Sequence, residues 1–352
     1  MAKVRIGFIG VGSMGQMAHL RNFVTNNDCE VVALAELREK TGKLVAQRYG
    51  VPNVYTDHLK MLEKESLDGV AVIQHFSHHA AILPDVYKRA KNVFTEKPLA
   101  VAVSAGAALA KAAGAAGCRH MVGYHKRSDP ASVYAKQTVD EWRRSGRMGK
   151  LRYIRMLVTM PEPDWGCSGF IGLLDGGDPR PALKGEPPLA GMSEDARREY
   201  LNIVNNYIHQ INLMHWFLGE SYHVSYADPT GIVMAVISDS GVPGVFELEP
   251  YRTTVEWEEF ILIAFEKGYI KLSLPSPMAI NRAGTVEIYE DPEKGKTPQR
   301  IFPTMPWIGA MRQQAINFVQ VCQGQMTPPC DVNEAVKDLH VVQDYIQLRF
   351  SH

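Results

Sequence analysis

The sequence has no excess of charge of either sign, and it has no apolar run long enough to span a membrane. Of its 352 residues, 38 are Lys or Arg and 38 are Asp or Glu. A balanced chain has no bulk positive field that would attract nucleic acid or anionic lipid. These absences favour a protein that binds neither nucleic acid nor membranes.

Cysteine is also scarce, and the thiols form no C-x-x-C pair. An odd number of scattered cysteines argues for reduced thiols rather than a disulfide framework. After Met1 the chain leads directly into a strand, without the apolar core of a signal peptide, so a cytoplasmic location is expected. The five cysteines are Cys29, Cys118, Cys167, Cys322 and Cys330.

A glycine-rich turn follows the first predicted strand, Val4–Ile9. The order is strand, G-x-G-x-x-G, helix, which is the context that a dinucleotide-binding motif requires. Gly10 makes the tight turn, Gly12 lets the backbone approach a pyrophosphate, and Gly15 lets helix and strand pack closely. With Ser13 and Met14 these glycines are the predicted pyrophosphate-binding residues, at the N-terminus of a helix.

An acidic residue ends the second predicted strand, residues 30–35, at the distance that the motif requires. Glu36 lies 21 residues after Gly15 and can accept hydrogen bonds from the ribose hydroxyls of the adenosine. Its charge would repel a 2′-phosphate and so favours NAD. Arg38, two residues later, could soften that preference, so NADP stays possible.

Strands and helices alternate through the first third of the chain, which predicts a doubly wound parallel sheet of the Rossmann type. After Gly123 the alternation stops, and a series of strands with short turns predicts an α+β domain with a large, open, mostly antiparallel sheet. The fold class is therefore α/β with a second α+β domain. The expected boundaries are 1–124, 125–330 and a C-terminal helix at 331–352 that packs back on the Rossmann domain.

The stretch Asn92–Pro98 places an acid beside a base at the end of a predicted strand. Val93, Phe94 and Thr95 are predicted to form a buried strand, and Pro98 ends it. Glu96 and Lys97 then lie at the carboxyl edge of the sheet, where open α/β sheets bind their ligands.

Taken together, these features resemble the glucose–fructose oxidoreductase / inositol dehydrogenase (Gfo/Idh/MocA) family. The resemblance rests on the glycine motif, Glu36, the Glu96-Lys97-Pro98 segment and residues 122–127 (Val-Gly-Tyr-His-Lys-Arg). It implies that Lys97 is the catalytic lysine beside the nicotinamide and that the Lys97–Pro98 bond is cis. The cationic ring would lower the pKa of Lys97. One departure is the segment Gln74–His79, which replaces the usual small-Thr-Pro segment after the fourth strand.

The resemblance also implies further site residues. The cofactor is expected to contact His75, His79, Glu96 and His125, and the substrate to contact Lys97, Tyr124, Asn205, His209 and Trp165. The spacing of His75, His78 and His79 matches no zinc ligand set, so no metal is expected.

A predicted helix from about Glu194 to Leu218 carries His209, which matches the histidine of a family motif. Leu201, Val204, Ile208 and Ile211 make its expected buried stripe, and Asn205, His209, Asn212 and Trp216 a neighbouring one. The positions of the two family aspartates hold Asn205 and Asn212. Since Asn cannot take a proton, Lys97 is expected to carry proton transfer and His209 to share the proton or hold the reacting hydroxyl.

A Gly- and Pro-rich insertion spans Pro161–Ala190, between the first strand of the second domain and this helix. Loops of this length in a compact domain are usually functional or disordered. It is interpreted equally as an arm packing on a neighbouring subunit or as a lid over the substrate. The open face of the second sheet implies a homodimer or homotetramer.

Three functions follow from these residues. The first is an NAD(P)-dependent oxidoreductase acting on CH–OH groups of a sugar, polyol or sugar derivative. The alternative is an NAD-dependent glycosidase or lyase that works through a transient keto-sugar. The third is a nucleotide-sensing protein that has lost turnover, suggested by Asn205 and the altered segment Gln74–His79.

Overall fold

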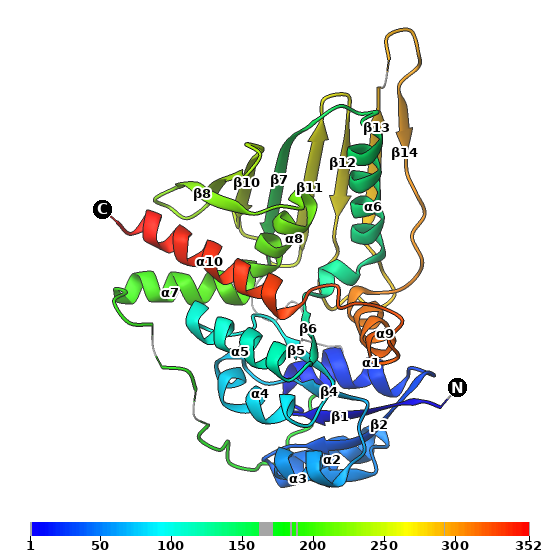
Figure 1. Cartoon of the computed structure of the whole chain (residues 1–352), viewed down its shortest axis with the longest axis vertical. Coiled ribbons are helices and arrows are strands. Elements are labelled where there is room, and N and C mark those ends of the chain that lie inside the picture. The colour runs from blue at the N-terminus through cyan, green and yellow to red at the C-terminus, as the bar shows by residue number, and fades with distance from the viewer. Residues whose placement is uncertain (1, 162–171, 184, 188, 292, 352) are drawn as a thin grey trace. The chain divides into compact units, whose positions relative to one another are not determined.

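A computed structural model describes residues 2–161, 172–183, 185–187, 189–291 and 293–351, and the chain divides into two compact units (Figure 1). Unit 1 comprises Met1–Tyr124, Cys167–Met192 and Met311–Leu339. Unit 2 comprises His125–Gly166, Ser193–Ala310 and His340–His352. The N-terminal unit is therefore completed by two segments from later in the sequence.

Unit 1 is built on a six-stranded parallel sheet with the order β3-β2-β1-β4-β5-β6. This order is that of a dinucleotide-binding Rossmann fold, and it confirms the first half of the predicted fold class. Because the strands are buried, they read as near-continuous apolar runs. Their bounds are β1 Val4–Ile9, β2 Cys29–Ala35, β3 Asn53–Tyr55, β4 Gly69–Val72, β5 Asn92–Glu96 and β6 Arg119–Gly123.

Helices follow the strands of this sheet, and the core between them is aromatic. Phe8 on β1 packs edge-on against Phe23, with ring centroids 5.2 Å apart, and Phe94 on β5 lies 5.5 Å from Phe318. Phe318 thus brings α9 into the core of unit 1. The helices are η1 Gly15–Leu20, α1 Arg21–Val24, α2 Glu39–Tyr49, α3 His58–Lys64, η2 Phe76–His78, α4 His79–Tyr87, α5 Val103–Ala115 and α9 Ala310–Cys322. A further helix, α10 Val332–Arg349, belongs to unit 1 as far as Leu339 and to unit 2 from His340.

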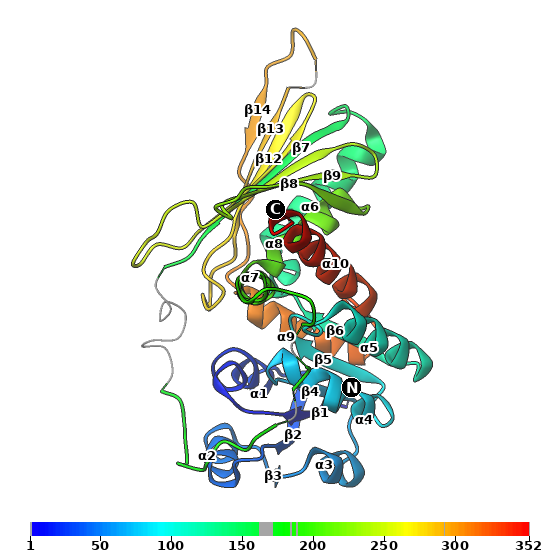
Figure 2. The ribbon, with the colours of Figure 1, turned by 90° about the vertical axis from the view of Figure 1, so that its left-hand side faces the viewer.

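Unit 2 contains an eight-stranded sheet with the order β14-β13-β12-β11-β7-β10-β9-β8. All its neighbouring strands are antiparallel except β7 and β10, which confirms a mostly antiparallel sheet. Figure 2 shows α6 and α8 on one face of this sheet. The elements are η3 His125–Ser128, α6 Pro130–Ser145, β7 Leu151–Thr159, α7 Glu194–Asn202, η4 Ile203–Tyr207, α8 Ile208–Leu218, β8 Tyr222–Ala227, β9 Val233–Ser238, β10 Pro243–Leu248, β11 Glu258–Phe265, β12 Gly268–Ser273, β13 Thr285–Glu290 and β14 Gln299–Ile301.

The predicted helix 194–218 is interrupted by a π-helical segment, η4, and this changes which residues are buried. Leu201, expected in the buried stripe, is 38% exposed, so that expectation was wrong. The stripe instead follows Ala196, Tyr200 and Val204. A π-helical turn holds more residues than an α-helical turn, so a stripe drawn at constant α-helical spacing drifts off the buried face.

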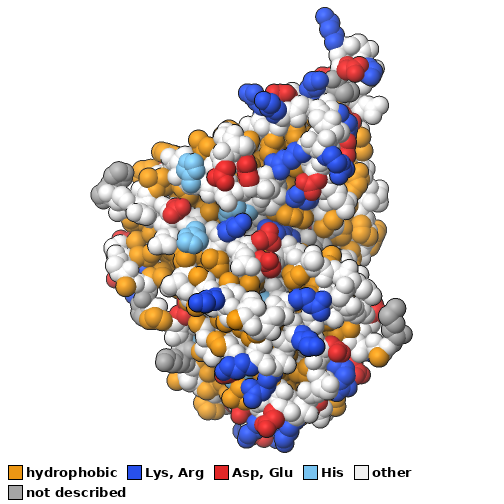
Figure 3. Space-filling view, viewed as in Figure 1, with side chains coloured by type: hydrophobic (Ala, Val, Ile, Leu, Met, Phe, Trp, Pro, Cys, Tyr) orange, Lys and Arg blue, Asp and Glu red, His pale blue; other side chains and the backbone are white. Residues whose placement is uncertain are grey.

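The surface carries both signs of charge. Figure 3 shows Lys and Arg side chains interspersed with Asp and Glu over the face seen there. None of the helices in the described part of the chain combines the length and the apolar character that a membrane crossing requires. In the same residues, no group of three or more His, Cys, Asp or Glu side chains is arranged to hold a metal ion.

Two histidines lie deep in unit 1 in their neutral form. The Nδ1 of His79 lies 3.0 Å from the carbonyl oxygen of Leu99, and burial lowers the pKa of His79 to about 4. The ring of His120 lies between the hydroxyls of Tyr87 and Thr95, at 2.7 and 2.9 Å, and burial lowers its pKa to about 3. An unfolded chain would protonate both rings near the ordinary value of 6.5.

Because the unfolded state binds these protons first, we expect the free energy of unfolding to fall as the pH drops below about 6.5, by up to about 1.4 kcal/mol per pH unit for each histidine. Urea unfolding of full-length protein at a series of pH values measures this slope. His120→Gln should reduce it, whereas His223→Gln, at an exposed position, should not. An unchanged slope in the His120 variant would contradict the assignment.

Candidate active site

The glycine loop after β1 has the geometry that the sequence motif requires. Gly10 adopts a φ of 90°, and a Cβ there would lie 2.3 Å from the Gln74 amide nitrogen. A Cβ on Gly15 would lie 2.9 Å from the carbonyl oxygen of Gly10. At Gly12, by contrast, a Cβ would meet no heavy atom of the described residues within 4 Å. The loop is therefore closed on its sheet side and open at Gly12, as a pyrophosphate group requires.

Glu36 lies at the end of β2 beside this loop. Its Oε2 accepts a hydrogen bond from the Val11 amide at 3.1 Å, and its Oε1 accepts from Nε of Arg38 at 3.0 Å. The hydrogen bond to Glu36 raises the pKa of Arg38. The acid therefore joins the glycine loop to the loop after β2, and Arg38 is engaged with Glu36 by two nitrogens.

Lys97 directly follows β5, and the residue before it is buried and paired. The Oε1 of Glu96 lies 2.5 Å from Nε2 of His19 in η1, and both residues are less than 10% exposed. Burial alone would raise the pKa of Glu96, but the hydrogen bond from His19 and the charges of His19 and Lys97 hold it below its usual range. The Lys97 amide donates to Oε2 of Glu96, and the Lys97–Pro98 bond is cis, as the resemblance implied.

The two predicted histidines after β4 lie in different surroundings. His75 is exposed, and its Nδ1 caps η2 by accepting from the amide of Ser77. His79 is fully buried at the start of α4, where its ring contacts the carbonyl oxygen of Leu99. The exposed ring can reach a ligand directly, whereas the buried ring supports the segment after Lys97 and Pro98.

In unit 2 the predicted residues His209 and His125 lie together. Their ring centroids are 4.5 Å apart with an interplanar angle of 77°, and the exposed fractions are 6% for His209 and 3% for His125. His125 begins η3, directly after the buried Tyr124 that ends the first of the three segments of unit 1. The orientation of the His209 ring is therefore set in part by an edge-to-face contact with a second imidazole.

A buried polar network lies next to this histidine pair in the sequence. The ammonium group of Lys126 forms an ion pair with Glu259 on β11, and Gln210 donates to Oε1 of Glu259 at 2.8 Å. Burial lowers the pKa of Lys126, and the charge of Glu259 opposes this shift. A buried charge of this kind is stable only when it is paired, so the network fixes the segment that carries His125.

The other residues of the predicted polar stripe beside His209 lie in different surroundings. Asn205 is exposed and its amide lies 3.3 Å from the side-chain oxygen of Asn206, whereas Asn212 is fully buried. The ring of Trp216 lies 5.5 Å from the guanidinium of Arg127. Trp165 lies outside the described residues.

Sequence reasoning missed several residues whose partners lie far away in the chain. His19 contacts Glu96 across 77 positions, and Gln210 contacts Glu259 across 49. One signal was available for His19, because it lies four positions after Gly15 on the helix that begins at the glycine loop. No spacing rule connects Gln210 to Glu259.

Comparison with known proteins gives one family match and several distant relatives. The model for the Gfo/Idh/MocA family, described as an oxidoreductase family with an NAD-binding Rossmann fold, matches residues 4–124. Myo-inositol 2-dehydrogenase of Thermotoga maritima is 23% identical over 243 residues, which cover 68% of this chain and 62% of the relative. Inositol 2-dehydrogenase of Acidothermus cellulolyticus is 31% identical over 147 residues, or 42% of each chain. The chain thus spans less than two thirds of the length of these relatives.

Solved structures share the fold over the full length. An oxidoreductase domain protein from Kribbella flavida has a TM-score of 0.76 at 19% identity, covering 100% of this chain and 98% of its own. The apo scyllo-inositol dehydrogenase from Lactobacillus casei has a TM-score of 0.69 at 16% identity, covering 99% and 96%. At these identities the likeness establishes the fold alone.

The family match supports the cofactor inferred from the glycine motif. The matched residues include the glycine loop, Glu36 and Lys97. The family is NAD-binding, which confirms the prediction of a dinucleotide cofactor. Residues 4–124 of this chain therefore match the NAD-binding Rossmann domain of the Gfo/Idh/MocA family of oxidoreductases, and inositol dehydrogenases are among the relatives of the chain.

Proposed function

We propose that this protein is an NAD-dependent oxidoreductase that transfers hydride to or from a CH–OH group of a sugar, polyol or sugar derivative. One observation carries the proposal: Lys97 directly follows β5, held by the buried Glu96–His19 contact, on the sheet edge that bears the open glycine loop. Curated relatives named as inositol dehydrogenases support this substrate class.

Bound NAD would supply the hydride acceptor, so the chain has to orient the alcohol and move one proton. In oxidation, Nζ of Lys97 takes the proton of the reacting hydroxyl, and in reduction it returns that proton. Glu96 stays ionised in this scheme, because its pKa is held below the usual range. Its negative charge balances the ammonium form of Lys97 that results from proton uptake.

For His209 we propose a binding role in unit 2. Its ring packs against His125, and Asn205, the residue four positions earlier, is exposed and bonded to Asn206. A histidine that is not held by a carboxylate from that position gains no added basicity from it. It is therefore suited to hold a substrate hydroxyl by a hydrogen bond.

The proposal is tested by incubating the full-length protein with NAD and a panel of inositols, aldoses and 3-keto sugars. Formation of NADH with at least one polyol or sugar is the expected result. Bond cleavage without net formation of NADH would instead indicate a glycosidase or lyase. Binding of NAD without turnover of any panel member would favour a nucleotide-sensing role.

Replacing the proposed proton-transfer group should separate catalysis from cofactor binding. We expect Lys97→Ala to lower kcat by about 10²- to 10⁴-fold, the usual contribution of a positioned acid or base. The dissociation constant for NAD should change by no more than about threefold, since Lys97 does not lie on the glycine loop. Lys91→Ala, at the exposed position before β5, is the control. A near-normal kcat for Lys97→Ala would refute the assignment.

A methyl group on the open glycine should block the cofactor while sparing the fold. Gly12→Ala introduces a Cβ into open space, so thermal stability should be unchanged, whereas the dissociation constant for NAD should rise about tenfold or more. Calorimetric titration and a thermal melt measure the two effects. Gly114→Ala, which also meets no described heavy atom within 4 Å, should leave NAD binding unaltered, and because Gly114 lies in α5 it should not lower the melting temperature. Equal NAD binding by Gly12→Ala would mean that the pyrophosphate does not bind at this loop.

We also propose that the sheet of unit 2 mediates a homo-oligomer. Residues on β11 alternate between buried positions and partly exposed apolar ones, among them Phe260 and Leu262. The neighbouring Arg155 and Glu247 form a bidentate pair, at 2.7 and 2.8 Å, on the same face. An apolar sheet face with its charges already paired is suited to pack against a second copy.

A charge in this face should weaken the assembly. Leu262→Glu is expected to shift the molar mass from light scattering toward that of one chain, because a buried unpaired carboxylate is costly. Leu44→Glu changes an exposed leucine on α2 and should leave the mass unaltered. A wild-type protein that is already monomeric would contradict the proposed role of this face.

A further inference from the structure

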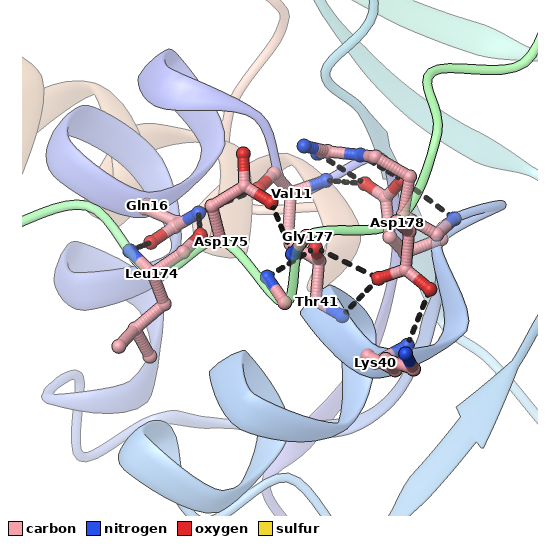
Figure 4. A network of polar contacts seen from close by, with 11 residues as sticks. Val11, Gln16, Lys40, Thr41, Leu174, Asp175, Gly177 and Asp178 are labelled. Carbon is pink, nitrogen blue, oxygen red and sulfur yellow. Dashed lines mark hydrogen bonds and ion pairs between the residues drawn. The ribbon is translucent and has the colours of Figure 1, made fainter.

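Part of the insertion between β7 and α7 lies against the nucleotide-binding edge of unit 1. The backbone of Leu174 is bonded at both groups to the side chain of Gln16: its amide donates to Oε1 at 2.9 Å, and its carbonyl accepts from Nε2 at 3.0 Å. The Leu174 side chain packs against the core of unit 1. Gln16 directly follows the last glycine of the loop, so the insertion is fixed beside the pyrophosphate-binding motif (Figure 4).

Four residues later, the carboxylate of Asp178 lies on the first turn of α2. Its Oδ2 accepts from the amide of Thr41 at 2.9 Å and from the Thr41 hydroxyl at 3.2 Å, and its Oδ1 accepts from the amide of Lys40 at 3.3 Å. Figure 4 shows this carboxylate pointing at the helix terminus. Burial would raise the pKa of Asp178, but these hydrogen bonds and the charge of Lys40 lower it, so the group is an anion.

The Asp178 carboxylate therefore lies against the start of α2, a few residues after Glu36, the acid proposed to bind the ribose. Glu36 ends β2, Arg38 follows it, and α2 begins at Glu39. A 2′-phosphate on the adenosine ribose would need donors from this same loop and helix terminus. Arg38 is already bonded to Glu36, and the first amides of α2 are already bonded to Asp178.

The insertion is attached to unit 1 at a second helix terminus as well. Glu186 accepts hydrogen bonds from the amides of Val101 and Ala102 at 3.1 and 3.0 Å, where α5 begins, and its own amide donates to the carbonyl of Ser77 at 2.8 Å. The described residues of the insertion are thus bonded to the loops after β2, β4 and β5. A segment fixed in this way has a defined position at the sheet edge.

We propose that the insertion completes the adenosine end of the cofactor site and that Asp178 determines its specificity. The Asp178 carboxylate occupies the anion position at the start of α2 that a 2′-phosphate would take, so the site accepts NAD and rejects NADP. Glu36 contributes to the same discrimination by its charge. This inference rests on the proposed nucleotide-binding function and adds a residue that lies 137 positions from Thr41.

The test compares Asp178→Ala with a matched variant of the same segment. Asp175→Ala removes an equal charge, but Oδ1 of Asp175 accepts from Gly177 within the insertion, and no hydrogen bond from Asp175 to α2 is seen among the described residues. Dissociation constants for NAD and NADP are measured by calorimetry on the full-length protein. We expect Asp178→Ala to lower the dissociation constant for NADP by about tenfold or more, because it removes a repelling charge and releases the amides at the start of α2. The dissociation constant for NAD should change by no more than about threefold. The charge of Asp175 also acts on Arg38, but this variant releases no amide of α2, so Asp175→Ala should change the ratio of the two constants clearly less than Asp178→Ala does.

A third variant separates charge from hydrogen bonding. Asp178→Asn keeps an acceptor for the Thr41 amide but removes the charge. The ratio of its dissociation constants for NADP and NAD should therefore lie between the ratios of the wild type and of Asp178→Ala. Equal shifts for the Asp175 and Asp178 variants, or a gain in affinity for NAD as large as that for NADP, would overturn the inference. The nucleotide-binding function on which the inference rests fails if the wild type binds neither nucleotide, which is a separate outcome from an unchanged ratio in the Asp178 variants.

Discussion

The buried contact between His19 and Glu96 is the interaction on which the nucleotide edge of unit 1 depends. It joins the helix after the glycine loop to the end of β5, and both side chains are almost inaccessible to water. Leaving either group buried without its partner costs about 1–3 kcal/mol or more for a charged group. Lys97 follows directly and donates its amide to the same carboxylate. One contact therefore sets the positions of the glycine loop and of the lysine together.

The parts of this site that the sequence predicted obey local rules. The glycine loop could be predicted because its glycines stand where a side chain does not fit. At Gly10 and Gly15 the atoms that exclude a side chain belong to the loop itself or to the segment directly after β4. The strands β4 and β5 could be read because buried parallel strands are almost continuously apolar. The strand β3, with three partly exposed residues, has no such pattern and was missed.

The parts that were not predicted depend on partners brought together by the fold. β7 pairs in parallel with β10, and the sequence predicted a mostly antiparallel sheet without indicating which pair of strands would be parallel. The long segment between β7 and β8 permits this, because it lets the chain return to the other side of β7. The attachment of Leu174 to Gln16, across 158 positions, likewise has no signature in composition. The Gly- and Pro-rich character of the insertion showed only that the segment is a loop.

The π-helical segment before His209 shows how one added residue changes the chemistry of a site. On a continuous α-helix, Asn205 would lie beside His209 and orient its ring. With η4 in place, Asn205 is exposed and bonded to Asn206, and the His209 ring meets His125 instead. His125 directly precedes Lys126, which is paired with Glu259, so a buried ion pair lies next to the residue that contacts the His209 ring. An aspartate at position 205 would then be exposed to solvent, as Asn205 is.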